Sequence, residues 1–187
     1  ATIIDGSLAP RGKKISFPNG MEWYQSNVTS GGFQCIYHAN NIWVAGSSDK
    51  GLYYSVDANH GPRVNNIKHF YSVYNANGLW VAAGQAGLYY STNGTYWVQS
   101  NLTSGKFLSV YNANGIWVAG NSSNKGLYYS VDGKTWTHSN ITSSAFKPIY
   151  NSNGIWVAGT WGYDGIYYSV DGKTWTQSNI KVDGAFS

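Results

Sequence analysis

A short motif built around tryptophan recurs along the whole chain and limits the folds that it can adopt. The motif reads (Ile/Leu)-Trp-Val-Ala, and its tryptophans are Trp43, Trp80, Trp117 and Trp156, at intervals of 37, 37 and 39 residues. A second motif, Gly-(Leu/Ile)-Tyr-Tyr-Ser, follows each copy, at residues 51–55, 87–91, 126–130 and 165–169. A third, Val-Asp-Gly-Lys-Thr-Trp-Thr-His-Ser-Asn at residues 131–140, closes the unit. A period of this length indicates a solenoid, a propeller or another repeat array.

Each repeat predicts four short β-strands. In the third copy we expect strands at 107–111, 116–120, 127–130 and 136–140. Asn114-Gly115 and Asp132-Gly133 supply the positive φ angles that two-residue hairpin turns need. Helical repeats require amphipathic runs of ten or more residues, and the sequence contains none. Four antiparallel strands in a repeat of about 38 residues make one blade of an all-β propeller.

The two ends of the sequence contain parts of a further copy. Residues 2–6, 13–16 and 23–27 match the second, third and fourth strands, and residues 185–187 match the start of a first strand. Joining them removes the exposed sheet edges that an open array would present. We therefore expect one propeller domain over residues 1–187, with five blades closed by the N- and C-terminal strands. Four blades with a stray strand, or a slice of a larger ring, are the alternatives.

Composition excludes several classes of protein. Charged residues make up 11% of the chain and aromatic residues 17%. Disordered segments have many charged residues and few aromatic ones, so this composition predicts a folded domain. The net charge is +4, but lysine and arginine are spread over the repeats, so we expect no nucleic-acid partner. No run approaches 18 apolar residues, so we expect no membrane insertion. Cys35 is alone, which leaves no internal disulfide.

Residues 130–136 and 169–175, both Ser-Val-Asp-Gly-Lys-Thr-Trp, resemble the Asp-box of sialidase-like and other propellers. The Asp-box is Ser-x-Asp-x-Gly-x-Thr-Trp, so these copies are one residue shorter between Asp and Gly. Residues 57–62 depart further and place Pro62 where the tryptophan belongs. The resemblance implies a fold and not an activity. Asp132 and Asp171 are expected to cap turn amides. By architecture alone, five-bladed rings of this size are also similar to tachylectin-type lectins and to platform domains of phage receptor-binding proteins.

The side chains that hydrolysis would need are scarce. Glycoside hydrolysis usually requires two carboxyl groups across a sugar, and Glu22 and seven aspartates are the whole supply. Three of these aspartates, at 57, 132 and 171, belong to hairpin turns. Resemblance to sialidases implies a cluster of arginines, yet only Arg11 and Arg63 are present. The four histidines show no metal-ligand spacing. We expect no enzyme, no cofactor and no metal.

Loops rich in hydroxyl and amide groups suggest a ligand instead. The loops between second and third strands and the connections between blades should emerge on one face of a propeller, opposite the hairpin turns. Directional hydrogen-bonding groups beside an aromatic ring are typical of sites for neutral sugars. The candidate ligand-binding residues are Ser47, Ser48, Asp49, Asn121, Ser122, Asn124, Trp161, Tyr163 and Asp164. The four repeated tryptophans are expected to be core between blades, because Trp buries so much area.

We therefore expect a lectin-like propeller that binds glycans or glycoconjugates through several weak sites acting by avidity. An extracellular, cell-surface or virion-associated location would suit this function. The alternative is a structural or protein-docking ring of a phage tail or surface adhesin, with a protein partner in a larger assembly. An asymmetric patch would favour docking, and equal use of several blades would favour the lectin.

Overall fold

The structure is a computed structural model that describes residues 31–57, 63–64, 69–123, 125–162 and 164–179, with the backbone of 14–16 and 22–24. Within this part of the chain every regular element is a β-strand. No helix among the described residues is long and apolar enough to cross a membrane. The predicted all-β class is confirmed.

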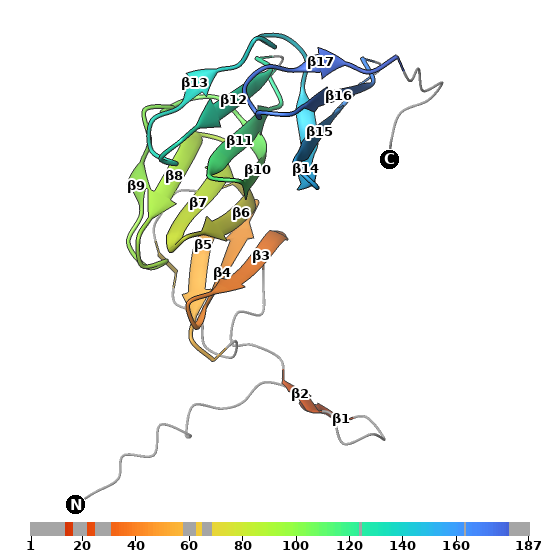
Figure 1. Ribbon diagram of the computed structural model, residues 1–187. Helices are drawn as coiled ribbons and strands as arrows, with labels where there is room; N and C mark the ends of the chain where they lie inside the picture. Colours follow the sequence, from red (N-terminus) through yellow and green to blue (C-terminus); the bar gives the residue numbers. More distant parts are fainter. Residues whose placement is uncertain are drawn as a thin grey trace, which may run out of the picture.

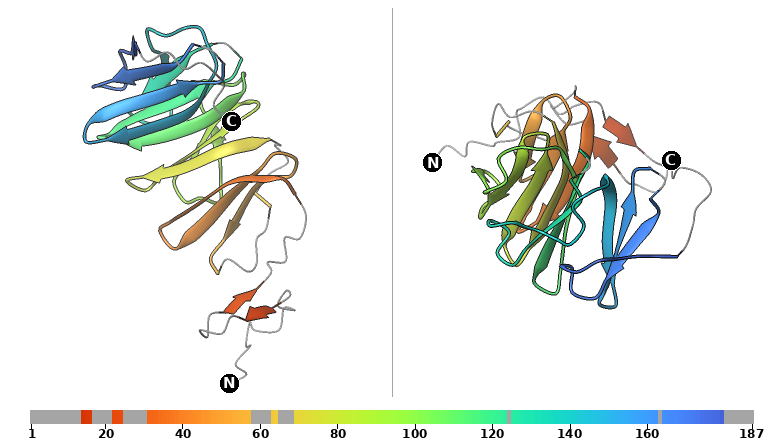
Figure 2. Two further views of the ribbon diagram at one scale, coloured as in Figure 1. Left: turned by 90° about the vertical axis from the view of Figure 1, so that its right-hand side faces the viewer. Right: turned by 90° about the horizontal axis from the view of Figure 1, so that it is seen from above.

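Four antiparallel sheets follow one another along an arc in the order of the sequence (Figures 1 and 2). The first sheet contains β3 (Phe33–Ala39), β4 (Ile42–Ser47) and β5 (Gly51–Ser55). The second contains β6 (Phe70–Ala76), β7 (Leu79–Gly84), β8 (Gly87–Ser91) and β9 (Val98–Gln99). The third contains β10 (Phe107–Ala113), β11 (Ile116–Asn121), β12 (Leu127–Ser130) and β13 (Thr137–His138). The fourth contains β14 (Phe146–Ser152), β15 (Ile155–Thr160), β16 (Ile166–Ser169) and β17 (Thr176–Gln177).

The strand register repeats from sheet to sheet. Each repeated tryptophan lies opposite the serine that ends the next strand, as in Trp117↔Ser130 and Trp156↔Ser169. The hairpins between first and second strands use left-handed residues, for example Asn114 with φ 51° and Gly115 with φ 77°. The predicted four-stranded unit with an Asn-Gly turn is therefore correct for the second, third and fourth sheets, although their fourth strand is shorter than expected. The first sheet has three described strands and turns at Asn40-Asn41.

The hydrophobic core lies between neighbouring sheets. Trp117, Phe107 and Trp136 of the third sheet pack on Val81 and Leu88 of the second. The other two junctions are built from the corresponding positions. Trp80, Trp117 and Trp156 are almost fully buried, so these three are core, as expected, whereas Trp43 is half-buried.

A row of tyrosines links the first strands of all four sheets. Tyr74 lies 4.8 Å from Tyr37 and 4.6 Å from Tyr111 between ring centroids, and Tyr111 lies 5.2 Å from Tyr150. Burial, followed by hydrogen bonds with the Tyr111 and Tyr37 hydroxyls, raises the pKa of Tyr74. The first three tyrosines also meet the next sheet's tryptophan edge-on, as Tyr74 meets Trp117. The sheets are thus held together by aromatic contacts as well as by aliphatic packing.

The first copy of the repeat is represented by β1 (Lys14–Ser16) and β2 (Glu22–Tyr24), which pair with each other. Figure 1 draws them apart from the four sheets, and closure of a ring is not observed. They pair Ile15 with Trp23, whereas Tyr129, at the position of Ile15 in the repeat, pairs with Thr137. The other residues assigned to a fifth blade, 2–6 and 185–187, lie outside the described part.

Candidate functional site

The loops between second and third strands meet the connections between sheets at one edge of the molecule. Main-chain hydrogen bonds mark each meeting point: Ser48 donates to Gly32, Ser122 to Lys106 and Trp161 to Ala145, over 2.7–2.8 Å. The predicted binding residues that the structure describes therefore lie at this loop edge. They fall into three separate clusters on three different sheets.

The cluster on the first sheet is held by its own hydrogen bonds. Ser47 is fully buried, and its hydroxyl donates to Asp49 Oδ1 over 2.6 Å and accepts from the Lys50 amide over 3.1 Å. Asp49 also accepts from the Gly32 amide over 2.8 Å. The Ser47 hydroxyl, together with the Gly32 amide, lowers the pKa of Asp49. Ser47 therefore stabilises the loop from inside and is not available to a ligand. Asp49 is exposed as an anion, and Ser48 lies next to it in the loop.

The cluster on the third sheet is also partly internal. Asn121 is 1% exposed, and its Oδ1 accepts from the Ser123 amide over 2.7 Å. Its Nδ2 atom has no hydrogen-bond partner in the described part of the structure. Ser122 donates to the Lys106 carbonyl over 3.2 Å, and Asn124 lies outside the described residues. Asn121 is thus too deeply buried for direct ligand contact.

The cluster on the fourth sheet presents an aromatic ring to solvent. Trp161 is 62% exposed, and the Lys147 ammonium lies 5.2 Å from its ring centroid. Asp164 Oδ2 accepts a hydrogen bond from the Ser144 hydroxyl over 2.8 Å. The structure therefore places Trp161 and Asp164 in one loop cluster, as expected, and adds Ser144 and Lys147. Tyr163 lies outside the described residues.

The opposite edge carries the hairpin turns that resemble the Asp-box. Asp132 Oδ1 accepts from the Ser130 hydroxyl and from the amides of Lys134 and Thr135, over 2.7–2.8 Å. Partial burial works to raise the pKa of Asp132, but these three donors outweigh it and the pKa lies below its ordinary value. Residues 169–175 repeat the network, and in the second sheet Asn93 takes the aspartate's place. These polar groups cap turns, which is the structural role expected of them.

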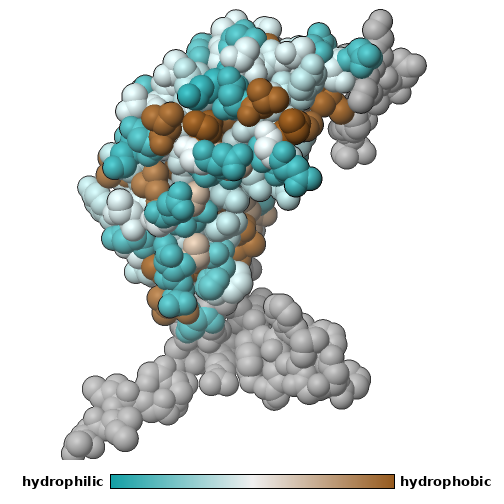
Figure 3. Space-filling model, in the orientation of Figure 1, coloured by the Kyte–Doolittle hydropathy of each residue, from teal (hydrophilic) through white to brown (hydrophobic). Residues whose placement is uncertain are grey.

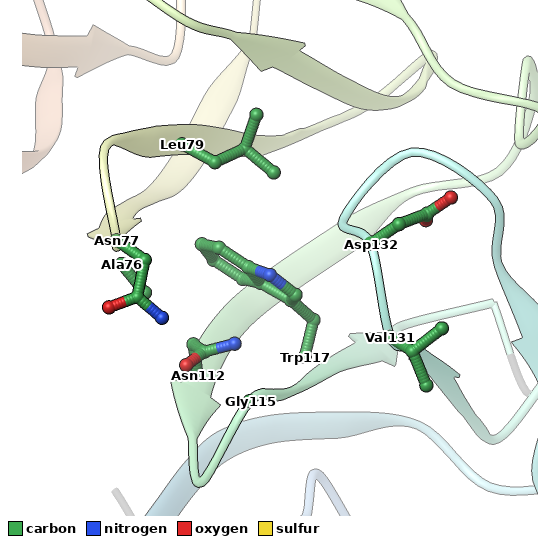
Figure 4. A pocket seen from close by; sticks show the side chains of 8 residues that line it. All are labelled: Ala76, Asn77, Leu79, Asn112, Gly115, Trp117, Val131 and Asp132. Atoms are coloured by element: carbon green, nitrogen blue, oxygen red, sulfur yellow. The ribbon is translucent and has the colours of Figure 1, made fainter.

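A pocket of about 210 Å³ opens at this turn edge between the second and third sheets (Figure 4). It is smaller than the roughly 300–1,000 Å³ of sites for drug-sized ligands. The indole of Trp117 lies in its wall, with Leu79 and Asn77 on one side and the turn at Asp132 on the other. Asn112, from the first strand of the third sheet, completes the polar lining. The sequence did not predict this pocket, because Trp117 was expected to be core between blades and the turn at Asp132 to be structural.

The described carboxyl groups do not gather into a recognisable reactive centre. Asp49, Asp132 and Asp171 each accept hydrogen bonds within their own loop or turn. No group of three or more His, Cys, Asp or Glu side chains in the described residues could hold a metal ion. The features that remain at the two edges are the exposed indole of Trp161 and the pocket beside Trp117.

No protein-family model matches the chain, and no curated protein matches it. Solved structures do match. The computationally designed Ika4 protein is similar at a TM-score of 0.61 and 13% identity, over 78% of this chain and 94% of that one. YCF48 from Cyanidioschyzon merolae is similar at 0.59 and 13% identity, over 94% of this chain and 61% of that one. These neighbours are propellers. The described sheets have the β-propeller fold.

A GH74 xyloglucanase from Xanthomonas campestris is also similar, at a TM-score of 0.58 and 14% identity. The match covers 84% of this chain and 32% of the enzyme, so the chain spans about a third of that propeller protein. At such identities the likeness concerns the fold alone. The propeller neighbours include enzymes and non-enzymes, and they assign no activity to this chain.

Proposed function

We propose that this propeller is a non-enzymatic carbohydrate-binding protein that recognises neutral glycans at its loop edge. The observation that carries the proposal is the exposed ring of Trp161, flanked by Lys147 and by the hydrogen-bonded pair Ser144 and Asp164. An aromatic face covers the apolar C–H surface of a sugar, while hydroxyl, carboxylate and ammonium groups fix its hydroxyls. Lys147 lies over the ring, and the indole presents a large apolar area to solvent.

The proposal includes several weaker sites at the corresponding loops of the other blades. Ser48, Gln85 and Ser122 occupy the position of Trp161, as their shared main-chain hydrogen bond to the preceding connection indicates. These loops offer polar groups without an exposed indole, so each is expected to bind more weakly than the Trp161 loop. Linked weak sites can raise avidity above single-site affinity by about 10²–10⁴ when they engage one surface together. Glycoconjugates on cell or virion surfaces present such arrays.

The test is a glycan-array screen of the full chain, followed by calorimetric titration with the best ligand. We expect saturable binding to one family of sugars with more than one site per chain. Trp161→Ala should weaken the strongest site at least about fivefold, because a stacking contact is lost. Tyr96→Ala is the matched control, since Tyr96 is an exposed aromatic at the opposite edge, in the turn after β8. Absence of binding across a broad array would overturn the proposal.

One observation favours a second candidate, a protein-docking ring. Trp161 has no aromatic counterpart at the other three positions, so the loop edge is asymmetric. A single site per chain in the titration, with binding to a protein surface and to no glycan, would support docking.

We also propose that the binding loops belong to a ring of five blades. Four blades correspond to the described sheets, and the fifth combines residues 2–27 with residues 185–187. The repeat of the sequence motifs supports this count.

A further inference from the structure

Neighbouring blades are joined by a pair of hydrogen bonds from one asparagine. Asn101, which follows β9, donates from Nδ2 to the Trp136 carbonyl over 3.0 Å and accepts the Trp136 amide at Oδ1 over 2.8 Å. Asn140, which follows β13, makes the same pair with Trp175, over 2.9 and 2.7 Å. We call this pair of bonds the asparagine clasp. Each clasp spans 35 residues and fixes the turn of one blade against the end of the previous one.

A sequence pattern accompanies the clasp. Trp-x-(Gln/His)-Ser-Asn occurs at residues 97–101, 136–140 and 175–179, and the same pattern occurs at residues 23–27. In the two clasps, the main chain of Trp136 or Trp175 is bonded by the asparagine that ends the same pattern in the preceding blade. Asn179, at the end of the fourth sheet, is exposed, and its side chain makes no hydrogen bond to any other described residue.

One face of the fourth sheet has no neighbouring blade among the described residues. In the other three sheets, the residues at the same positions pack against the following blade. Val157 is 41% exposed, whereas Val44, Val81 and Val118, at the same position, are fully buried. Tyr150, Ile155 and Tyr168 are exposed on the same sheet. The first sheet shows the complementary face: Phe33 is 40% exposed, whereas its three counterparts are buried. Figure 3 shows hydrophobic side chains at the surface beside β3 and β4.

We propose that the N-terminal copy of the repeat, residues 2–27, covers the open face of the fourth sheet, with the Asn179 amide clasping the main chain of Trp23. The proposal deepens the five-blade count and is independent of the sugar. Every internal junction joins a Val/Tyr face of one sheet to a Phe/Trp face of the next. The fourth sheet has an open Val/Tyr face and the first sheet has an open Phe face, so one further blade placed between them would cover both. A head-to-tail interface of this kind either closes a ring or propagates between chains. The fourth copy of the Trp-x-(Gln/His)-Ser-Asn pattern selects closure, because it supplies the missing partner within the same chain.

The proposed junction also specifies a register. In the third sheet Tyr129 pairs with Thr137. The corresponding residues of the N-terminal copy are Ile15 and Tyr24, so we expect Ile15 to pair with Tyr24 when the copy lies against the fourth sheet. That register differs by one residue from the Ile15↔Trp23 pairing of the separate β1–β2 hairpin.

The experiment measures how fast a thiol at position 157 reacts with a thiol reagent in the full chain. Cys35→Ser provides the background, because Ser72 and Ser109 occupy the same position in other blades. Val157→Cys is compared with Val118→Cys, which is buried, and with Val131→Cys, in an exposed turn. We expect Val157→Cys to react at least about tenfold more slowly than Val131→Cys, as buried groups exchange through local opening. Adding Asn179→Ala or Trp23→Pro should speed the reaction, whereas Asn101→Ala, at a distant junction, should not.

Two outcomes would overturn the proposal. One is a reaction at Val157→Cys as fast as at Val131→Cys, which would mean that the face is open. The other is protection that disappears when the protein is diluted about a hundredfold, because a second copy would then be the occupant. Reaction rates at this face do not depend on any sugar. Failure of the junction and failure of glycan binding are therefore distinguishable.

Discussion

The loop edge and the turn edge of the same blades differ in what their residues do. At the turn edge, the three turns at residues 91–97, 130–136 and 169–175 repeat one hydrogen-bond network almost atom for atom. At the loop edge the main-chain bonds repeat, but the side chains at the same position change from Ser48 to Gln85, Ser122 and Trp161. The hydrogen bonds that stabilise the fold can thus repeat at one edge of the blades, while the exposed side chains vary at the other edge.

The largest expected difference between the edges concerns two tryptophans. Trp136→Ala should lower the free energy of unfolding by about 3–5 kcal/mol, because the ring is buried and donates to Gly133 O. Trp161→Ala should change it by less than about 0.5 kcal/mol, since the ring is mostly exposed. Denaturant unfolding of both variants checks this. Equal losses would show that the loop edge is also structural.

A substitution at Gly126 tests whether the backbone at the loop edge also contributes to stability. A Cβ at Gly126, where φ is 71°, would lie 1.8 Å from the Ile141 carbonyl oxygen. We expect Gly126→Ala to cost about 2–3 kcal/mol through backbone displacement. Gly115→Asn is the control, because that position is open and Asn41 occupies its counterpart at φ 57°. Thermal melting of the two variants should separate them clearly.

The turn network should tolerate an amide but not a methyl group. Asp132→Ala removes the acceptor of three hydrogen bonds and should cost about 1–2 kcal/mol. Asp132→Asn should cost much less, because Asn93 fills the same role in the second sheet. A ranking in which both variants are equally unstable would mean that the carboxylate charge matters more than its geometry.

The smallest expected effect is a dependence of the free energy of unfolding on pH in the acid range. The folded-state pKa values of Asp132 and Asp171 lie below 3.8, so the unfolded chain takes up protons first as the pH falls. Their contribution is complete well above pH 3.8 and is lost as the pH falls through the folded-state values. The slope of stability against pH in this range should decrease in Asp132→Asn. An unchanged slope would assign the acid dependence to other carboxyl groups.

Sequence predicted the parts of this structure that depend on local chemistry. The period of the tryptophan motif, the Asn-Gly hairpins and the Ser-x-Asp turns each gave correct elements, because neighbouring residues determine them. The burial of Ser47 and Asn121 could not be predicted, since a polar residue in a loop looks the same whether its hydrogen bonds go inward or outward. Lys147 was missed because it lies 14 residues before Trp161 and approaches the ring only across the β14–β15 hairpin.

The asparagine clasp has a consequence for covalent modification. Asn101 and Asn140 both lie in Asn-x-Thr sequons, the acceptor signal for N-linked oligosaccharides. A glycan would be attached to the Nδ2 atom that donates to Trp136 or Trp175, which places the bulky substituent at a junction between two blades. In a secretory pathway, transfer to these asparagines would therefore compete with blade assembly on the nascent chain. Once the blades have assembled, the Nδ2 atom of each asparagine donates a hydrogen bond between blades.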